Sequence, residues 1–253
     1  MAVNQDWGLA VDELRRRLGY WLRQDPARLL WPRQCLACGE PGQAGLDLCC
    51  ACTLHWPRLA CACPGCALPL PQPGVCGACV RRRASARRRP PLDGVHAACR
   101  YVAPADRLLL RFKFHRDLAA GALLAQLMAQ AFFDSPRPAA LVPLPLHRAR
   151  LRRRGYDQAL ELARPLARTL ALPLVEDRLV RVRATGPQSE LDRTERLGNV
   201  RGAFAVRDGP ALPAHVVLVD DVMTTGATLA EAARTLRRAG VSRVEAWVCA
   251  RAV

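Results

Sequence analysis

Residues 216–228 read VVLVDDVMTTGAT, an apolar run that ends in two aspartates and a threonine- and glycine-rich turn. Four consecutive apolar residues predict a strand covered on both faces, as in a parallel sheet. A helical pattern follows from Thr228 to Ala239, and Gly240 closes it in the usual C-terminal glycine position. In open α/β sheets, ligands bind outside the carboxyl ends of the strands. We therefore expect a pocket where Asp220 and Asp221 stand.

The acidic pair and the turn after it carry the donors and acceptors that a sugar phosphate needs. Two adjacent carboxylates can accept hydrogen bonds from vicinal ribose hydroxyls, and backbone N–H groups at a helix N-terminus bind a phosphate dianion. Glycine in the turn allows close approach of backbone and phosphate. Paired aspartates after an apolar strand also occur in magnesium-binding phosphoacceptor domains, but the full order ending in TTGxT is much rarer. The candidate ligands in the turn are Thr224, Thr225, Gly226, Ala227 and Thr228.

Short apolar runs alternate with helical patterns along the rest of the C-terminal part. Such alternation predicts an α/β fold, a parallel sheet with helices on its faces. Pro165 lies inside one helical pattern and is expected to kink or shorten that helix. Further strands are expected near Ala97–Val102, Ala140–Leu144 and Val244–Ala250, and further helices near Leu118–Phe133 and Tyr156–Leu170.

Ten of the twelve cysteines lie between Cys35 and Cys79. Eight of these ten form four CxxC pairs in two sets, and the sets repeat after 28 residues (Cys35 to Cys63) or 27 residues (Cys49 to Cys76). Each CxxC turn can aim two thiolates at one ion, and two turns complete a tetrahedral zinc site. Four thiolates leave no open position for water, so the zinc should be structural. The spacing leaves open whether the pairs close in order or cross-brace, and how many ions they hold. The expected ligands are Cys35, Cys38, Cys49, Cys52, Cys63, Cys66, Cys76 and Cys79.

Four cysteines fall outside the CxxC pairs. Cys50 and Cys61 have no expected role. Cys99 and Cys249 lie in apolar, strand-like runs, where a buried side chain is a better interpretation than a catalytic thiol.

The formal net charge is +16, which favours polyanionic partners such as phosphorylated metabolites, nucleic acid or anionic lipid. Arg81–Arg89 holds six arginines in nine residues and is either a solvated linker or a patch for nucleic-acid phosphates. An amphipathic helix is expected from Trp7 to Gln24, either packed on its own protein or docked on a partner or membrane surface. Lys113 is the only lysine of the chain, and its ammonium is either required there or merely exposed.

No targeting segment or membrane span is recognisable in the sequence. We therefore expect a cytoplasmic protein, with peripheral attachment at the inner membrane as the alternative. Four parts are expected: an N-terminal helix (1–34), a zinc-binding module (35–80), a basic linker (81–94) and an α/β domain (95–253).

Two upstream segments complete a recognisable set of motifs. Residues 141–147 read LVPLPLH, and RRRGYDQ follows at 152–158. Residues 183–204 read RATGPQSELDRTERLGNVRGAF, a long polar stretch of the kind that is usually functional within a compact domain. Together with the cysteine-rich start and VDDVMTTGAT, these motifs resemble the ComF family from Cys35 to the C-terminus. The acidic turn itself resembles the ribose-phosphate loop of type I phosphoribosyltransferases.

The resemblance implies a type I phosphoribosyltransferase-like domain and a role for each motif. Its substrate would be 5-phosphoribosyl-1-pyrophosphate (PRPP), bound with Mg²⁺. The loop of Pro143, Leu144 and Pro145, continuing to His147, would hold pyrophosphate. Thr185, Gln188, Arg196 and Asn199 would fall in a mobile loop that closes over the substrate. This chain has Tyr156-Asp157 where the family more often has Phe-Asn. The residues expected to stabilise the reacting charges are Asp220, Asp221, Arg153, Arg154 and Arg196, with Lys113 as a further substrate contact.

Two functions of different class remain open from the sequence. The first is an enzyme that transfers phosphoribosyl groups to an unidentified acceptor, in a ComF-like role in DNA uptake and natural transformation. The second is a non-catalytic module of the DNA-uptake machinery that binds PRPP or single-stranded DNA. The fold hosts both classes, so fold analogy does not choose between them. DNA-uptake proteins are the expected protein partners, and the sequence does not give the oligomeric state.

Overall fold

The structure is a computed structural model of the chain, described for residues 33–85, 89–184 and 200–253. It divides between His55 and Trp56 into two compact units. The N-terminal helix expected at residues 7–24 lies outside the described residues.

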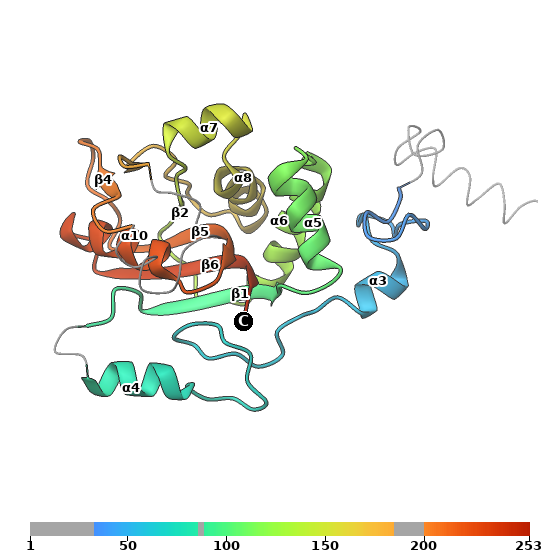
Figure 1. Cartoon of the computed structure of the whole chain (residues 1–253), viewed down its shortest axis with the longest axis horizontal. Coiled ribbons are helices and arrows are strands. Elements are labelled where there is room, and N and C mark those ends of the chain that lie inside the picture. Colours follow the sequence, from blue (N-terminus) through green and yellow to red (C-terminus); the bar gives the residue numbers. More distant parts are fainter. Residues whose placement is uncertain (1–32, 86–88, 185–199) are drawn as a thin grey trace, which may run out of the picture. The chain divides into compact units, whose positions relative to one another are not determined.

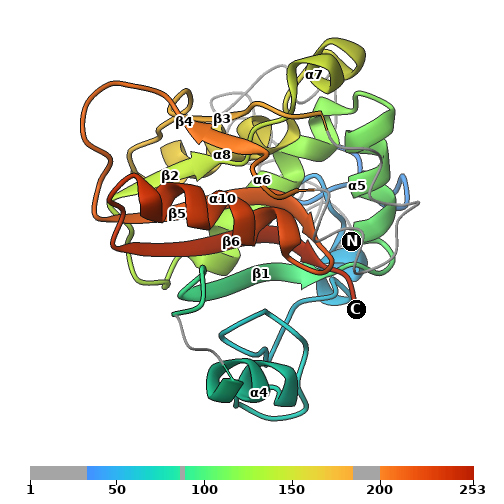
Figure 2. The ribbon, with the colours of Figure 1, turned by 60° about the vertical axis from the view of Figure 1, so that its left-hand side comes forward.

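The larger unit is built on a four-stranded parallel sheet with the order β1-β6-β5-β2 (Figures 1 and 2). The register pairs Val219 of β5 with Pro143 of β2 on one side and with Trp247 of β6 on the other. The predicted α/β fold with a parallel sheet is confirmed. The strands are β1 (Gly94–Arg100), β2 (Ala140–Pro143), β5 (His215–Met223) and β6 (Arg243–Arg251).

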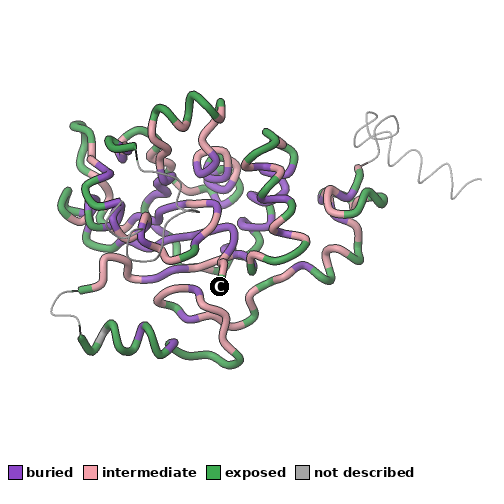
Figure 3. Tube along the Cα trace, in the orientation of Figure 1, coloured by how far each residue is buried: buried purple, intermediate pink, exposed green. Residues whose placement is uncertain are grey.

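Helices cover both faces of this sheet, and Figure 2 shows α10 on the opposite side from α6 and α8. Trp247 of β6 points toward α6 and stacks on Phe132 with ring centroids 4.8 Å apart. Its neighbours Ala246 and Val248 point the other way and pack with Leu236 of α10. Buried residues thus lie on both faces of the sheet and on the helices that cover them (Figure 3). The helices are α5 (Ala105–Phe114), α6 (Leu118–Phe132), α7 (Arg148–Arg154), α8 (Gln158–Leu170) and α10 (Ala227–Arg238).

A short antiparallel hairpin flanks the segment 185–199 in the sequence. Its strands are β3 (Leu179–Arg181) and β4 (Phe204–Val206), and Arg181 pairs with Phe204 in the register. Leu179 and Phe204 are buried in the same core as α10, which ties the hairpin to the sheet domain.

The second cysteine set belongs to the same compact unit as the sheet. Three hydrogen bonds join its loop region to the strands: Val95 N–H to Pro64 O (3.0 Å), Arg100 N–H to Pro57 O (2.8 Å) and Arg251 Nε to Cys66 O (2.9 Å). Ala67 is fully buried in the core that also holds the α10 side chains. Helix α4 (Gly77–Ser85) follows this set. The smaller unit holds the first cysteine set and α3 (Cys50–Leu54).

Several element boundaries differ from the predictions. The first strand begins at Gly94 and ends at Arg100, not at Ala97–Val102, because the chain turns away from β6 after Arg100 and leaves Val102 39% exposed. Helix α8 begins at Gln158 and continues past Pro165 to Leu170, so the proline does not shorten it. Helix α4 extends to Ser85, into the expected linker, because alanine and arginine are good helix formers.

Helices α5 and α7 were not predicted. The only apolar stripe in α5 is Leu108, Leu109 and Phe112, too short to give a clear period. Helix α7 has seven residues, five of them arginine, and therefore has no apolar stripe at all.

Candidate functional site

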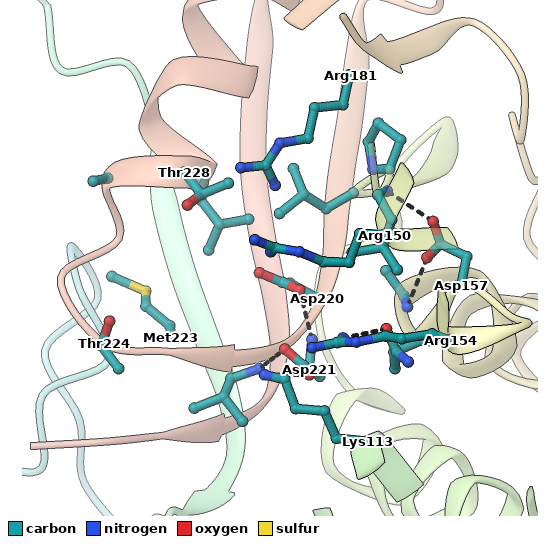
Figure 4. Close-up of a pocket in the computed structure, with 18 of the residues that line it drawn as sticks. Lys113, Arg150, Arg154, Asp157, Arg181, Asp220, Asp221, Met223, Thr224 and Thr228 are labelled. Atoms are coloured by element: carbon teal, nitrogen blue, oxygen red, sulfur yellow. Dashed lines mark hydrogen bonds and ion pairs between the residues drawn. The ribbon is translucent and has the colours of Figure 1, made fainter. Parts of the chain in front are cut away.

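A pocket of about 310 Å³ opens where β2 and β5 end (Figure 4). Its floor is the end of β5 with Asp220 and Asp221, and one wall is the turn from Thr224 to Thr228. The other walls come from the loop after β2, the arginine-rich α7, the end of α5 and Arg181 of β3. Segments far apart in the sequence therefore meet at the carboxyl edge of the sheet, where ligands of open α/β folds bind.

The acidic pair at the floor is held by its own backbone and by one cation. Asp220 accepts a hydrogen bond from the backbone N–H of Asp221 (2.8 Å), and Asp221 accepts one from that of Val222 (2.7 Å). Lys113 Nζ lies 3.1 Å from Asp221 Oδ2. Burial and the adjacent Asp221 carboxylate raise the pKa of Asp220 well above its usual range, and Lys113 acts in the opposite direction. The ammonium group thus offsets part of the cost of placing two carboxylates side by side.

The turn after the acidic pair presents the N-terminus of α10 to the pocket. Gly226 has φ +75°, the left-handed region that glycine enters without strain, and the helix begins at the next residue. A Cβ added at Gly226 would lie 2.5 Å from Met223 Cε. The turn is therefore tightly packed and leaves the first amides of a twelve-residue helix facing the pocket. Such amides and the positive end of the helix dipole attract a phosphate.

Asp157 fixes the loop after β2 against α8. One carboxylate oxygen accepts the backbone N–H of Leu146 (2.8 Å), and the other accepts those of Ala159 (3.1 Å) and Leu160 (3.3 Å) at the start of α8. Burial raises the pKa of Asp157, while these three N–H groups oppose the rise. An asparagine, which is common at this position in the family, has a single acceptor oxygen and can therefore accept either the bond from Leu146 or the bonds from α8, but not both.

Five cations line the pocket: Lys113, Arg150, Arg153, Arg154 and Arg181. Arg154 is engaged by the protein, since it donates to Gln158 Oε1 (2.8 Å) and its guanidinium lies 5.6 Å from the ring centre of Phe114. Three carboxylates, those of Asp157, Asp220 and Asp221, share the pocket with these cations. The site therefore has an excess of positive charge, as expected for a polyanionic ligand.

Most residues that the sequence suggested for the site meet in this pocket. They are Lys113, Leu144, Pro145, Arg153, Arg154, Asp220, Asp221 and the turn from Thr224 to Thr228. Pro143 is the last residue of β2, is buried, and does not line the pocket. Thr185, Gln188, Arg196 and Asn199 lie outside the described residues.

Two of the five cations of the pocket, Arg150 and Arg181, were missed as site candidates. The only sequence signal for Arg181 is an arginine that alternates with Leu179 in a very short strand. Arg150 is one of many arginines between residues 148 and 154, and only the structure separates it from its neighbours.

The eight CxxC cysteines form two separate clusters, and in each the four sulfurs lie within 4.8 Å of one another. The sulfurs of Cys38 and Cys49 lie 3.7 Å apart, and those of Cys66 and Cys76 lie 3.6 Å apart. A tetrahedral zinc with Zn–S bonds of about 2.3 Å would place its sulfurs about 3.8 Å apart. The donor set and spacing thus fit structural zinc, and the pairs close in chain order. One cluster is Cys35, Cys38, Cys49 and Cys52, and the other is Cys63, Cys66, Cys76 and Cys79.

Backbone amides favour thiolates in both clusters. Burial opposes ionisation of Cys35, but N–H groups of Cys49, Cys38 and Ala37 lower its pKa to about 6. Four cysteines stand outside both clusters, and two of these, Cys99 and Cys249, are buried, as expected; Cys99 Sγ donates to Cys249 O at 3.2 Å. Among the described residues, no helix has the length and apolar character needed to cross a membrane.

Known protein families match both the cysteine-rich part and the α/β part of the chain. Residues 27–80 match the double zinc ribbon domain family, and residues 157–252 match the phosphoribosyl transferase domain family. The DNA utilization protein YhgH of Salmonella typhi is 32% identical over 228 residues, which are 87% of this chain and 97% of that protein.

Two competence proteins are also similar. Competence protein F of Haemophilus influenzae is 36% identical over 70% of this chain and 78% of its own length. Competence protein ComFC of Bacillus subtilis is 32% identical over 70% of this chain and 72% of its own length. With a double zinc ribbon, a phosphoribosyltransferase-type domain and relatives that match nearly end to end, the chain belongs to the ComF family of competence and DNA utilization proteins.

Proposed function

We propose that the pocket binds PRPP with Mg²⁺ and that the protein transfers its phosphoribosyl group to an acceptor, in a role in DNA utilization like that named for its relatives. One observation carries the proposal: the acidic pair and the N-terminus of α10 open into the same pocket, with cations around them. A sugar phosphate with a second, polyanionic substituent needs this combination of acceptors, amides and positive charge.

Each wall of the pocket has a role in this proposal. The carboxylates of Asp220 and Asp221 accept hydrogen bonds from the ribose hydroxyls, and the amides from Thr224 to Thr228 receive the 5-phosphate. The loop after β2, fixed by Asp157, faces the diphosphate end. The ion pair with Lys113 holds Asp221 in place, so the lysine acts on the ribose contact through the carboxylate.

The reaction breaks the bond between the anomeric carbon and the diphosphate oxygen, and both electrons leave with pyrophosphate. The anomeric carbon becomes positively charged and is attacked by a lone pair of the acceptor. Mg²⁺, when bound with the substrate, neutralises part of the charge on the leaving diphosphate. The guanidinium groups of the pocket stabilise the remainder without having to reorganise.

Release of pyrophosphate tests this proposal. Full-length protein is incubated with PRPP and Mg²⁺, alone and with a panel of nitrogen-base acceptors, and pyrophosphate is quantified. We expect release that depends on Mg²⁺ and rises with at least one acceptor. PRPP binding without release under any of these conditions would contradict transfer and leave the non-catalytic binding module.

A second candidate function, binding of single-stranded DNA, is favoured by the surface next to the pocket. Arg148, Arg152 and Arg153 of α7 are exposed beside the pocket, whereas Arg81 and Arg82 of α4, which are also exposed, lie away from α7 (Figures 1 and 2). Binding to backbone phosphates should weaken steeply with salt and show little sequence preference. No binding at low salt would identify these arginines as an ordinary solvated surface.

A further inference from the structure

Two arginines that come from different elements stand on the same wall of the pocket. Arg150 lies in α7 and Arg181 is the last residue of β3, yet both line the pocket. Figure 4 shows both side chains extending into the pocket on the side of Asp220. The same view shows Asp220 below Arg150, and the charges of Arg150 and Asp220 both act on the pKa of Arg181.

Arg181 is held in place by its surroundings. The residue is only 9% exposed, and its guanidinium lies 5.5 Å from the ring centre of Phe204, its partner in the β3–β4 register. A buried arginine loses hydration that is recovered only through contacts with negative charge or hydrogen-bond acceptors. Its rigid position favours a specific role in the pocket over a solvated one.

The charges around the two arginines favour an anion between them. Burial and the guanidinium of Arg150 lower the pKa of Arg181, while Asp220 acts in the opposite direction. Burial, Arg154 and Arg153 likewise lower the pKa of Arg150. Four like charges in one wall are costly, and a polyanionic ligand relieves that cost on binding.

Other polar groups of the pocket already contact protein side chains or suit another part of the ligand. Lys113 is paired with Asp221, and Arg154 is engaged by Gln158 and Phe114. The α10 amides lie on the turn after β5 and suit a single phosphate. A ligand with phosphate at both ends therefore needs a second phosphate-binding wall, and the guanidinium groups for it come from the half-buried Arg150 of α7 and the buried Arg181 of β3.

We propose that Arg150 and Arg181 together form the diphosphate-binding wall of the pocket, receiving the pyrophosphate group in the substrate and as it leaves. This inference rests on the proposed function and assigns its second phosphate site. Planar guanidinium groups can each make two parallel hydrogen bonds to phosphate oxygens, which an ammonium group cannot do.

The test compares two fragments of the substrate, inorganic pyrophosphate and ribose 5-phosphate, by calorimetric titration with Mg²⁺ present. Arg150→Gln and Arg181→Gln should each lower pyrophosphate affinity about ten- to a hundredfold, the loss of charge-assisted hydrogen bonds. Affinity for ribose 5-phosphate should change by less than about threefold, because only the long-range charge is altered. Arg181→Lys keeps the positive charge but loses the planar guanidinium group. Its affinity for pyrophosphate should therefore lie between those of the wild type and Arg181→Gln.

Arg168→Gln is the matched control, since it removes one exposed arginine of α8 remote from this pocket. It should bind both fragments as wild type does. If circular dichroism shows that Arg181→Gln is unfolded, the test is made with Arg150→Gln, because Arg150 is partly exposed and its replacement should leave the fold intact. Unchanged pyrophosphate affinity in folded variants, or equal losses of affinity for both fragments, would contradict the assignment of Arg150 and Arg181 as the diphosphate-binding wall. If the wild-type protein binds PRPP and the variants bind pyrophosphate as the wild type does, only this inference is wrong. If the wild-type protein binds neither PRPP nor pyrophosphate, the proposed function is wrong.

Discussion

Replacing Cys63 and Cys66 by serine is expected to destabilise the whole unit Trp56–Val253, whereas the same change at Cys35 and Cys38 should disorder only the N-terminal unit. A structural zinc site contributes roughly 10–16 kcal/mol to folding of its module, as much as the entire stability of a typical domain. The difference between the two sites should therefore arise from what each module contacts.

The second ribbon is interlocked with the sheet. Pro64 and Cys66 accept hydrogen bonds from Val95 and Arg251, and Ala67 is buried in the α10 core. Loss of zinc would free these carbonyls and open the core below them. The first cysteine set lies in a separate unit that ends at His55, so its loss leaves those contacts intact.

Metal analysis and thermal unfolding of the two double variants check this expectation. Wild-type protein should contain two zinc ions per chain, and each double variant one. The melting temperature of the sheet domain should fall by many degrees for Cys63→Ser with Cys66→Ser and stay unchanged for Cys35→Ser with Cys38→Ser. Equal melting temperatures in both variants, or zinc-free protein that melts normally, would refute the structural role.

Gly226→Val is expected to abolish PRPP binding within the measurable range, a loss of about a hundredfold or more in affinity. The residue has φ +75°, which a β-branched side chain tolerates poorly, and a Cβ there would lie 2.5 Å from Met223 Cε. The end of the Met223 side chain can move aside, but relief of the backbone strain requires the turn to shift, and with it the amides proposed to hold the 5-phosphate. Equilibrium titration with PRPP and Mg²⁺ measures the effect.

Gly240→Val is the matched control for backbone strain. Gly240 has φ +95° just beyond the other end of α10, with open space where a Cβ would point. Both variants should lose stability through the unfavourable backbone angle, and only Gly226→Val should lose affinity. Equal PRPP affinity in the two variants would show that the α10 turn does not hold the phosphate.

The parts of the fold that could be predicted are those in which one local pattern decides the outcome. The apolar run before Asp220 and Asp221 could only be a covered strand, and the CxxC spacing could only bring thiols together in pairs. Helices α5 and α7 escaped prediction because the apolar stripe of α5 is too short to give a clear period and α7 has none, so both depend on tertiary packing. Their place beside the pocket follows from the tertiary structure.

The site was predictable where a motif is continuous and not where it is assembled. The turn from Thr224 to Thr228 is one segment, so its residues were identified together. Arg150, Asp157 and Arg181 acquire their roles from partners distant in the sequence, such as Leu146 for Asp157 and Phe204 for Arg181. Lys113 was suspected for being the only lysine, and its contact with Asp221 gives that suspicion a physical basis.

Calorimetric titration of full-length protein with PRPP, with and without Mg²⁺, tests the central claim most directly. Wild-type protein should bind, more tightly with Mg²⁺, and Asp221→Asn should weaken binding about ten- to a hundredfold through loss of charge-assisted hydrogen bonds. Asp208→Asn, which changes an exposed carboxylate outside the pocket, should bind as wild type does. No binding at millimolar PRPP, or an Asp221→Asn variant with wild-type affinity, would contradict the assignment of this pocket.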